Sequence, residues 1–229
     1  YARVVQTPAG PRLAAAADPA KDQSYVLFEL PAATLRRIVL PLGEWTKRRV
    51  RAKAASLGLA VADKPESQDI CLVPAGQHGR LIEQRRPGSV RPGPVLDAAG
   101  QVVGRHRGFQ NYTIGQRRGL GVAAGSPIYV TAIDPAANAV TVGPADLLRR
   151  REMTCSRVVW HRAAGQANGP VRAVVKIRYR APGSAATVVP LAADRVRVLF
   201  DHPASAITPG QAAVFYDQSA MVLGGGWID

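Results

Sequence analysis

Short apolar segments recur at even spacing through the last third of the chain, from residue 151 to residue 229. Turn-forming residues such as Pro209-Gly210 separate them, and no helical period runs between them. The expected strands are 158–161, 171–178, 186–190, 195–200, 212–216 and 221–225. A run of short strands at this spacing predicts a small β-barrel or β-sandwich.

A second set of strand-like segments occupies residues 77–150. Glycine and proline turns interrupt it. Strands are expected at 94–97, 102–105, 128–133 and 139–142, with a turn at 134–138 between the last two. The sequence therefore predicts a separate small, mainly-β domain in the middle of the chain.

The first 76 residues mix strand and helix patterns. Residues 1–14 alternate and turn at 8–11, which predicts a hairpin. Helical spacing follows at 31–40 and, more clearly, at 45–57, where Gly58 is placed to end the helix. The apolar stripe of the second helix consists of Val50, Ala54 and Leu57. This block is predicted to be α+β.

The charge of the chain is strongly positive. Lys and Arg number 30 against 16 Asp and Glu, giving a formal net charge of +14, and most of the cations are arginine. Arginine grips phosphate through planar, bidentate contacts and stacks on bases, so the excess suits a nucleic-acid partner. A generally arginine-rich composition with a solvated basic surface is the alternative.

Composition also excludes several classes of protein. No run of about 18 apolar residues and no signal peptide is present, so we expect a cytoplasmic protein without a membrane partner. The two cysteines are far apart and form no C-x-x-C pair. They therefore predict neither a disulfide framework nor a metal site.

Cys71 is the residue with the most reactive side chain in a distinctive setting. It follows the polar residues 67–69, and Lys64 is close in sequence. A cysteine acts as nucleophile or sulfur carrier when its thiolate is stabilised and accessible. The other interpretation is a small buried side chain packed with Ile70 and Leu72. Local chemistry leaves both open.

Two cationic segments are candidates for RNA contact. The sequence KDQS at 21–24 can meet phosphates and base edges, or simply cap a helix. The sequence KIRYR at 176–180, if a strand, places Lys176, Arg178 and Arg180 on one face. Such a face suits an RNA backbone with a stacked base, or protects an exposed edge strand by its charge.

The sequence YTIGQRRGLG at 112–121 combines three glycines with two adjacent arginines. The glycines permit a tight backbone path, and the arginines can grip phosphates. It lacks the G-x-x-x-x-G-K-[ST] pattern, so it is not a P-loop.

Seven motifs occur in one order along essentially the whole chain: KDQSY at 21–25, PLG at 41–43, SQDIC at 67–71, YTIGQRRGLG at 112–121, RYR at 178–180, TPGQ at 208–211 and GGG at 224–226. This set strongly resembles the tRNA-specific 2-thiouridylase family. The resemblance implies a cytoplasmic tRNA-uridine 2-sulfurtransferase that uses ATP, with Mg²⁺, to adenylate O2 of the wobble uridine. A cysteine persulfide, loaded by a sulfur donor or relay protein, then delivers sulfur to carbon 2.

The resemblance also implies the roles of particular residues. Cys71 matches the persulfide cysteine, which cycles through a disulfide with a partner cysteine. The matches to tRNA contacts are Lys21, Asp22, Gln23, Arg178, Tyr179 and Gln211. The implied partners are tRNA and the sulfur donor, with neither membrane nor DNA.

The implied fold is an α+β remainder of an ATP-pyrophosphatase (α/β) domain over residues 1–76. Two small mainly-β domains follow, at 77–150 and 151–229, the last a tRNA-binding β-barrel.

The family's S-G-G-x-D-S nucleotide motif, partner cysteine and neighbouring acid are missing from this sequence. We expect all three, and with them the ATP site, upstream of Tyr1, where the chain starts without Met in a strand-like pattern. Cys155 has no matching motif around it and is expected to be structural. The expectation is therefore a C-terminal part of a thiouridylase that is inactive alone. Turnover by these 229 residues in a thiolation assay would contradict it.

Two other functions remain possible on sequence grounds. One is a non-catalytic tRNA-binding fragment or degraded paralogue of the family. The other is an unrelated thiol enzyme that uses Cys71 with a histidine, although no histidine lies in a convincing motif.

Overall fold

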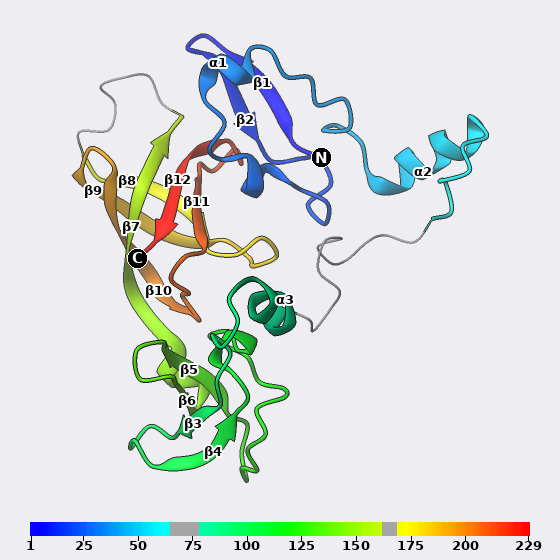
Figure 1. Ribbon diagram of the computed structural model, residues 1–229. Helices are drawn as coiled ribbons and strands as arrows, with labels where there is room; N and C mark the ends of the chain where they lie inside the picture. Colours follow the sequence, from blue (N-terminus) through cyan, green and yellow to red (C-terminus); the bar gives the residue numbers. More distant parts are fainter. Residues whose placement is uncertain (65–77, 162–168) are drawn as a thin grey trace. The chain divides into compact units, whose positions relative to one another are not determined.

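The computed structural model describes residues 1–64, 78–161 and 169–229 (Figure 1). The chain forms two compact units. The first unit contains residues 1–64, 151–204 and 208–229, and the second contains residues 65–150 and 205–207. Cys71 lies outside the described residues.

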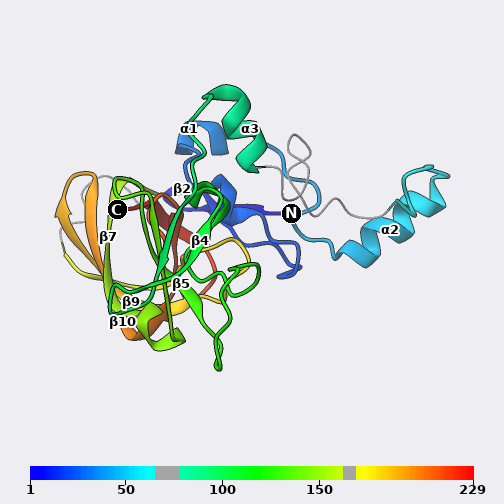
Figure 2. The ribbon, with the colours of Figure 1, turned by 60° about the horizontal axis from the view of Figure 1, so that its bottom comes forward.

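A closed six-stranded barrel forms the largest part of the first unit. Its strands are β7 (Arg149–Trp160), β8 (Val171–Lys176), β9 (Ser184–Ala192), β10 (Arg195–Ser205), β11 (Ala212–Tyr216) and β12 (Val222–Ile228). They follow the order β10-β7-β12-β11-β8-β9, and the pairing of β9 with β10 closes the barrel, on which Figure 2 labels β7, β9 and β10. Closure leaves no strand edge unpaired. The barrel expected from the spacing of the segments is thus confirmed.

The three glycines near the end of the chain lie inside β12, where they permit close packing. A Cβ on Gly225 would lie 2.5 Å from Cδ2 of Phe28 and 2.9 Å from the Ala213 carbonyl oxygen. The glycines therefore let the N-terminal part of the chain approach the barrel's backbone.

The N-terminal part of the first unit contains the predicted hairpin, made of β1 (Arg3–Thr7) and β2 (Gly10–Ala14). A 3-10 turn η1 (Ser24–Leu27) and two helices, α1 (Ala32–Leu35) and α2 (Lys47–Ser56), follow. The helix expected over 31–40 is only one turn long. Ile38 N–H still donates to Thr34 O at 3.0 Å, and Pro41 then disfavours helical geometry at Leu40.

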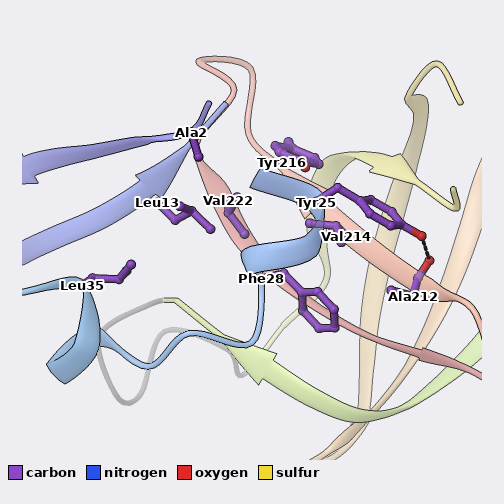
Figure 3. Close-up of a cluster of buried hydrophobic side chains, with 9 residues drawn as sticks. All are labelled: Ala2, Leu13, Tyr25, Phe28, Leu35, Ala212, Val214, Tyr216 and Val222. Carbon is purple, nitrogen blue, oxygen red and sulfur yellow. Dashed lines mark hydrogen bonds between the residues drawn. The ribbon is translucent and has the colours of Figure 1, made fainter. Parts of the chain in front are cut away.

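An apolar cluster attaches this N-terminal part to the barrel (Figure 3). The cluster joins residues of the hairpin, η1 and α1 to residues of β11 and β12: Ala2, Leu13, Tyr25, Phe28, Leu35, Ala212, Val214, Tyr216 and Val222. Each fully buried large side chain contributes about 1.5–3 kcal/mol. Ala15 N–H also donates to Ala220 O at 2.9 Å.

Helix α2 begins at Thr46, whose Oγ1 accepts a hydrogen bond from Arg49 N–H at 3.3 Å. Gly58 ends the helix with φ +66°, as predicted. No side chain of α2 is buried by the described residues, and Leu57 is 59% exposed. Val50 and Ala54 are half-buried and Leu57 is exposed, so the described residues do not bury the apolar stripe completely.

The second unit contains a four-stranded sheet of order β4-β3-β6-β5. The strands are β3 (Gly93–Leu96), β4 (Val102–His106), β5 (Tyr129–Asp134) and β6 (Ala139–Gly143), close to the predicted bounds. Helix α3 (His78–Arg85) was not predicted, and two 3-10 turns, η2 (Phe109–Asn111) and η3 (Ala145–Leu148), complete the unit. Its core contains Val95, Leu120, Val130, Val140 and Val142.

Among the helices that the structure describes, none is both long and apolar enough to pass through a bilayer.

Candidate nucleic-acid interface

Asp22 is the buried polar centre of the KDQSY segment. Its Oδ1 accepts hydrogen bonds from the backbone N–H groups of Ala16 and Ser24, both at 3.0 Å, and its Oδ2 accepts from Ser24 Oγ at 2.9 Å. Lys176 Nζ lies 3.5 Å from Oδ2. Asp side chains commonly bind the backbone two residues ahead in this way. All of these contacts lie within the protein, so the Asp22 carboxylate stabilises the conformation of the KDQSY segment and pairs it with β8.

Two buried tyrosines extend this network to β11. Ser24 Oγ lies 3.1 Å from the hydroxyl of Tyr216, and the Tyr25 hydroxyl donates to Ala212 O at 2.7 Å (Figure 3). Burial raises the pKa of Tyr25 to about 12, against a smaller lowering by the charge of Arg178. Burial also raises the pKa of Tyr216. Both phenols are neutral at physiological pH.

Strand β8 ends at Lys176, and the chain bends and turns over 177–180. Ala181 N–H donates to Arg178 O at 3.2 Å, which closes the turn. The expectation that Lys176, Arg178 and Arg180 share one strand face was therefore wrong. Pro182-Gly183 follows directly, and such a pair favours a turn over a continued strand.

Arg178 and Tyr179 lie on this turn. Arg178 Nη2 donates to Thr208 Oγ1 at 3.3 Å. The ring of Tyr179 lies 6.2 Å from that of Tyr25 at an interplanar angle of 59°, and the Tyr179 side chain is exposed. The turn thus presents a half-buried guanidinium beside an accessible aromatic ring.

Gln211 belongs to the turn that precedes β11. Its N–H donates to Thr208 O at 3.2 Å, and its carbonyl accepts from Ile228 N–H at 2.8 Å. Gly210 in this turn has φ +79°, a conformation that favours glycine. Thr208 therefore contacts both residues: its carbonyl oxygen accepts from Gln211 N–H, and its hydroxyl oxygen accepts from Arg178 Nη2.

Six of the seven predicted site residues lie in the described part of the chain, all within the first unit. Lys21, Asp22 and Gln23 come from one segment, and Arg178, Tyr179 and Gln211 from two others. The ion pair of Lys176 with Asp22 and the contact of Tyr25 with Tyr179 join these segments. Gln23 is exposed and Lys21 half-buried.

The sequence reasoning did not assign a role in this connection to Ser24, Tyr25, Thr208 or Tyr216, and it named Lys176 only as a cation of the KIRYR segment. Ser24, Tyr25 and Thr208 lie inside motifs that the sequence singled out, so the signal was present. The pairing of Lys176 with Asp22 and the contact of Tyr216 with Ser24 had no local signal, because they depend on strands that meet only in the folded barrel.

Cys155 is fully buried and free. Burial, assisted by the negative charge of Asp229, raises the pKa of its thiol to about 12. A thiol with this environment is chemically inert, in agreement with the expected structural role. Within the described ranges no group of three or more His, Cys, Asp or Glu side chains is arranged to hold a metal ion.

Three family models match successive parts of the chain. The tRNA methyl transferase HUP domain matches residues 1–75, the tRNA methyl transferase PRC-barrel domain residues 81–144, and the aminomethyltransferase beta-barrel domain residues 150–228. The expected fold class is confirmed: part of a HUP domain is followed by two small β domains, the last a closed six-stranded barrel.

Curated relatives cover nearly all of the chain, and each is a tRNA-specific 2-thiouridylase MnmA. The protein of Roseiflexus castenholzii is 52% identical over 217 residues, 95% of this chain and 58% of its own length. That of Rhodospirillum rubrum is 46% identical over 235 residues, the whole of this chain and 62% of the relative. That of a Synechococcus species is 48% identical, again over the whole chain and 64% of the relative. The chain thus spans about three fifths of the length of these relatives, and it belongs to the tRNA-specific 2-thiouridylase family.

Proposed function

We propose that the protein containing this chain is a tRNA-uridine 2-sulfurtransferase, which thiolates the wobble uridine of tRNA at the expense of ATP. The observation that carries the proposal is the joining of the KDQSY segment to the Arg178–Tyr179 turn through Asp22–Lys176 and Tyr25–Tyr179. In a member of this family, these are the segments expected to contact tRNA.

In this proposal the first unit binds tRNA through residues of different roles. Arg178 and Lys21 contact phosphates, while the exposed ring of Tyr179 stacks on a base. Gln23 and Gln211 supply amide groups for hydrogen bonds to base or ribose. Asp22 is a positioning residue, since its carboxylate is occupied within the protein.

Cys71 carries the sulfur in this proposal, as a persulfide loaded by a donor or relay protein. The terminal sulfur forms a bond to carbon 2 of the uridine, and the oxygen on that carbon leaves with the adenylate that ATP supplied. The sequence contains no S-G-G-x-D-S motif. The proposal therefore assigns ATP and Mg²⁺ to residues outside this chain. A partner cysteine there attacks Sγ of Cys71, which breaks the S–S bond and leaves the terminal sulfur on carbon 2, and an external thiol then reduces the resulting disulfide. The proposed location of the protein is the cytoplasm. The proposal also divides the chain into three domains, at residues 1–76, 77–150 and 151–229.

Two variants of the whole protein separate chemistry from binding. Cys71→Ala is expected to abolish thiolation of a tRNA transcript while tRNA affinity is unchanged. Arg178→Ala is expected to weaken tRNA binding roughly ten-fold and to reduce the salt dependence by about one phosphate contact. Arg197→Ala is the matched control, because Arg197 is an exposed arginine of β10 whose guanidinium group pairs with no described residue.

The outcomes discriminate between the candidate functions. Thiolation by Cys71→Ala at the normal rate would refute the role of Cys71. Normal tRNA binding without thiolation by the unaltered whole protein would identify a non-catalytic tRNA-binding member of the family. A salt slope unchanged by Arg178→Ala would remove Arg178 from the interface.

A further inference from the structure

The YTIGQRRGLG motif of the second unit borders two adjoining hollows. The smaller hollow, about 320 Å³, is lined by Arg105, Arg107, Asn111 and Tyr112 together with Gly119 and Gly121. The larger, about 450 Å³, shares both glycines and contains Arg117 at its wall, beside residues 120–124 and 126–128. Neither hollow is lined by an Asp or Glu.

His106 fixes the direction of the two arginines on either side of it. Its ring is buried, and its Nδ1 accepts a hydrogen bond from Gly108 N–H at 3.1 Å. Nε2 therefore carries the proton and donates to Asn138 O at 3.0 Å. Side chains alternate along a strand, so the inward His106 leaves Arg105 and Arg107 exposed at the end of β4.

The 112–121 loop is held in one conformation. The Gln116 side chain accepts from Thr113 N–H at 3.0 Å and donates to Arg118 O at 2.9 Å. Val130 exchanges two backbone hydrogen bonds with Gly115 and Gln116, and Leu120 is buried in the core of the unit. A surface ordered in advance loses little entropy on binding a ligand.

Hydrogen-bond donors gather around the hollows without internal acceptors. The guanidinium groups of Arg105, Arg107, Arg117 and Arg118 form no ion pair or hydrogen bond with any residue that the structure describes. The backbone N–H groups of Gly119 and Gly121 also donate to no carbonyl oxygen of the residues that the structure describes. Both glycines have positive φ, +70° and +67°, and such backbone forms concave anion sites.

Two arginines of the first unit show the contrasting case, in which an acid occupies the guanidinium group. Arg172 pairs with Asp201 at 2.6 Å, and Arg195 with Asp229 at 3.1 Å. Over residues 78–150 there are ten arginines and four acids, and Glu83 and Asp97 are occupied by backbone N–H groups. The cations of the hollows are therefore available to an external anion.

We propose that these two hollows, which we name the arginine hollows, bind successive phosphates of the tRNA backbone and form a second RNA contact on the second unit. This inference rests on the proposed function, since it assumes that the protein binds tRNA. Forked guanidinium groups and glycine N–H donors match phosphodiester oxygens. Two shallow adjoining hollows with dispersed cations suit a run of phosphates better than a single nucleotide, which needs a deeper apolar cavity for its base.

The test compares two double variants of equal charge change. Arg105→Gln/Arg107→Gln removes two cations of the smaller hollow. Arg85→Gln/Arg86→Gln removes two exposed arginines of the same unit that line neither hollow. Affinity for an unmodified tRNA transcript is measured over a range of salt concentrations. The hollow variant is expected to lose roughly ten-fold or more in affinity for tRNA. The slope of log affinity against log salt concentration is expected to fall by about one to two units. The control variant is expected to lose less than about two-fold in affinity.

Equal losses in both double variants would show a diffuse charge effect and overturn the inference. No loss in the hollow variant, while Arg178→Ala still weakens binding, would overturn the inference and leave the proposed function standing. An unaltered protein that binds no tRNA would overturn both.

A second readout follows the backbone donors directly. Addition of tRNA is expected to shift the amide NMR signals of Gly119 and Gly121 in a saturable way. Polyglutamate is expected to shift them weakly, because its carboxylates lack the tetrahedral array of phosphate oxygens. Saturable shifts with polyglutamate and none with tRNA would assign the hollows to an acidic protein and overturn the inference. Arg105→Lys/Arg107→Lys, which keeps the charge without the forks, is expected to show an intermediate loss of affinity.

Discussion

Asp22 shows how much one buried carboxylate can organise. It is 6% exposed and satisfies two backbone N–H groups, one hydroxyl and one ammonium group. Asp22→Ala leaves these donors buried without an acceptor, so we expect the free energy of unfolding to fall by about 2–4 kcal/mol. Urea denaturation measures the change.

The control for this prediction is Asp194→Ala, an exposed acid in a turn of the same unit, expected to change stability by less than about 0.5 kcal/mol. A second variant tests the cause. Asp22→Ala/Lys176→Met is expected to be more stable than Asp22→Ala alone, because Lys176 no longer lacks a counter-charge. Equal stability of these two would mean that the unpaired ammonium group of Lys176 costs nothing in Asp22→Ala.

Cys155 offers a second prediction about a single residue. With a pKa of about 12, its thiol is almost entirely protonated at pH 8, where only about one molecule in ten thousand carries the thiolate. Of the two cysteines of the given sequence, Cys155 is the one that Cys71→Ala leaves, and the peptide that contains it is followed separately. We expect no alkylation by iodoacetamide in the native state and full alkylation in urea, followed by mass spectrometry. Rapid native labelling would contradict the buried position.

Among the elements, η1 couples stability to pH through Tyr25. Its pKa is raised from 10.0 to about 12, so the protonated phenol is favoured in the folded state. The resulting stabilisation is present below pH 10 and is lost as the pH rises from 10 to 12, with a size of about 2–3 kcal/mol. Tyr25→Phe is expected to flatten this part of the stability–pH curve, measured by denaturation at several pH values.

The remaining slope has an identifiable source. The pKa of Tyr216 is also raised by burial, so Tyr25→Phe/Tyr216→Phe is expected to flatten the curve further. A curve that keeps its full slope in the double variant would show that neither phenol is responsible.

Elements with a strong local period were predictable, and those set by distant contacts were not. Strand β11 was predicted to the residue, because the apolar run 212–216 is bounded by turn residues. The strand predicted over 171–178 was two residues too long, since the alternation continues beyond Lys176, where the chain in fact turns. Helix α3 escaped prediction because Gly and Pro surround its short helical pattern.

The site divides in the same way. Cation and aromatic motifs marked Lys21–Gln23, Arg178 and Tyr179 in the sequence, but nothing local indicated that Lys176 pairs with Asp22. That contact depends on β8 lying beside β11 and on η1 packing against both. The Lys176–Asp22 pair joins residues more than 150 positions apart in the sequence, and local hydrophobic periodicity cannot predict contacts at that separation.

At the scale of the whole molecule, the first unit is built from segments separated by the second unit in the chain. Closing such a long loop costs only slightly more than closing a short one. Several contacts between the N-terminal part and the barrel offset that entropy cost. Arg12 Nη2 donates to Val222 O at 3.3 Å, His161 Nε2 contacts Phe28 O, and Phe28 packs on Gly225. The N-terminal part and the barrel therefore share one core.

This shared core predicts that the N-terminal part and the barrel unfold together. Gly225→Ala places a Cβ 2.5 Å from Phe28 Cδ2 and is expected to cost about 2 kcal/mol. Native-state hydrogen exchange should show the same loss of protection at the amides of Ala15 and of β11. Gly125→Ala, where a Cβ meets nothing within 4 Å, is the control and should change neither. If Gly225→Ala lowered protection at Ala15 alone, the N-terminal part would be opening independently of a barrel that is stable by itself.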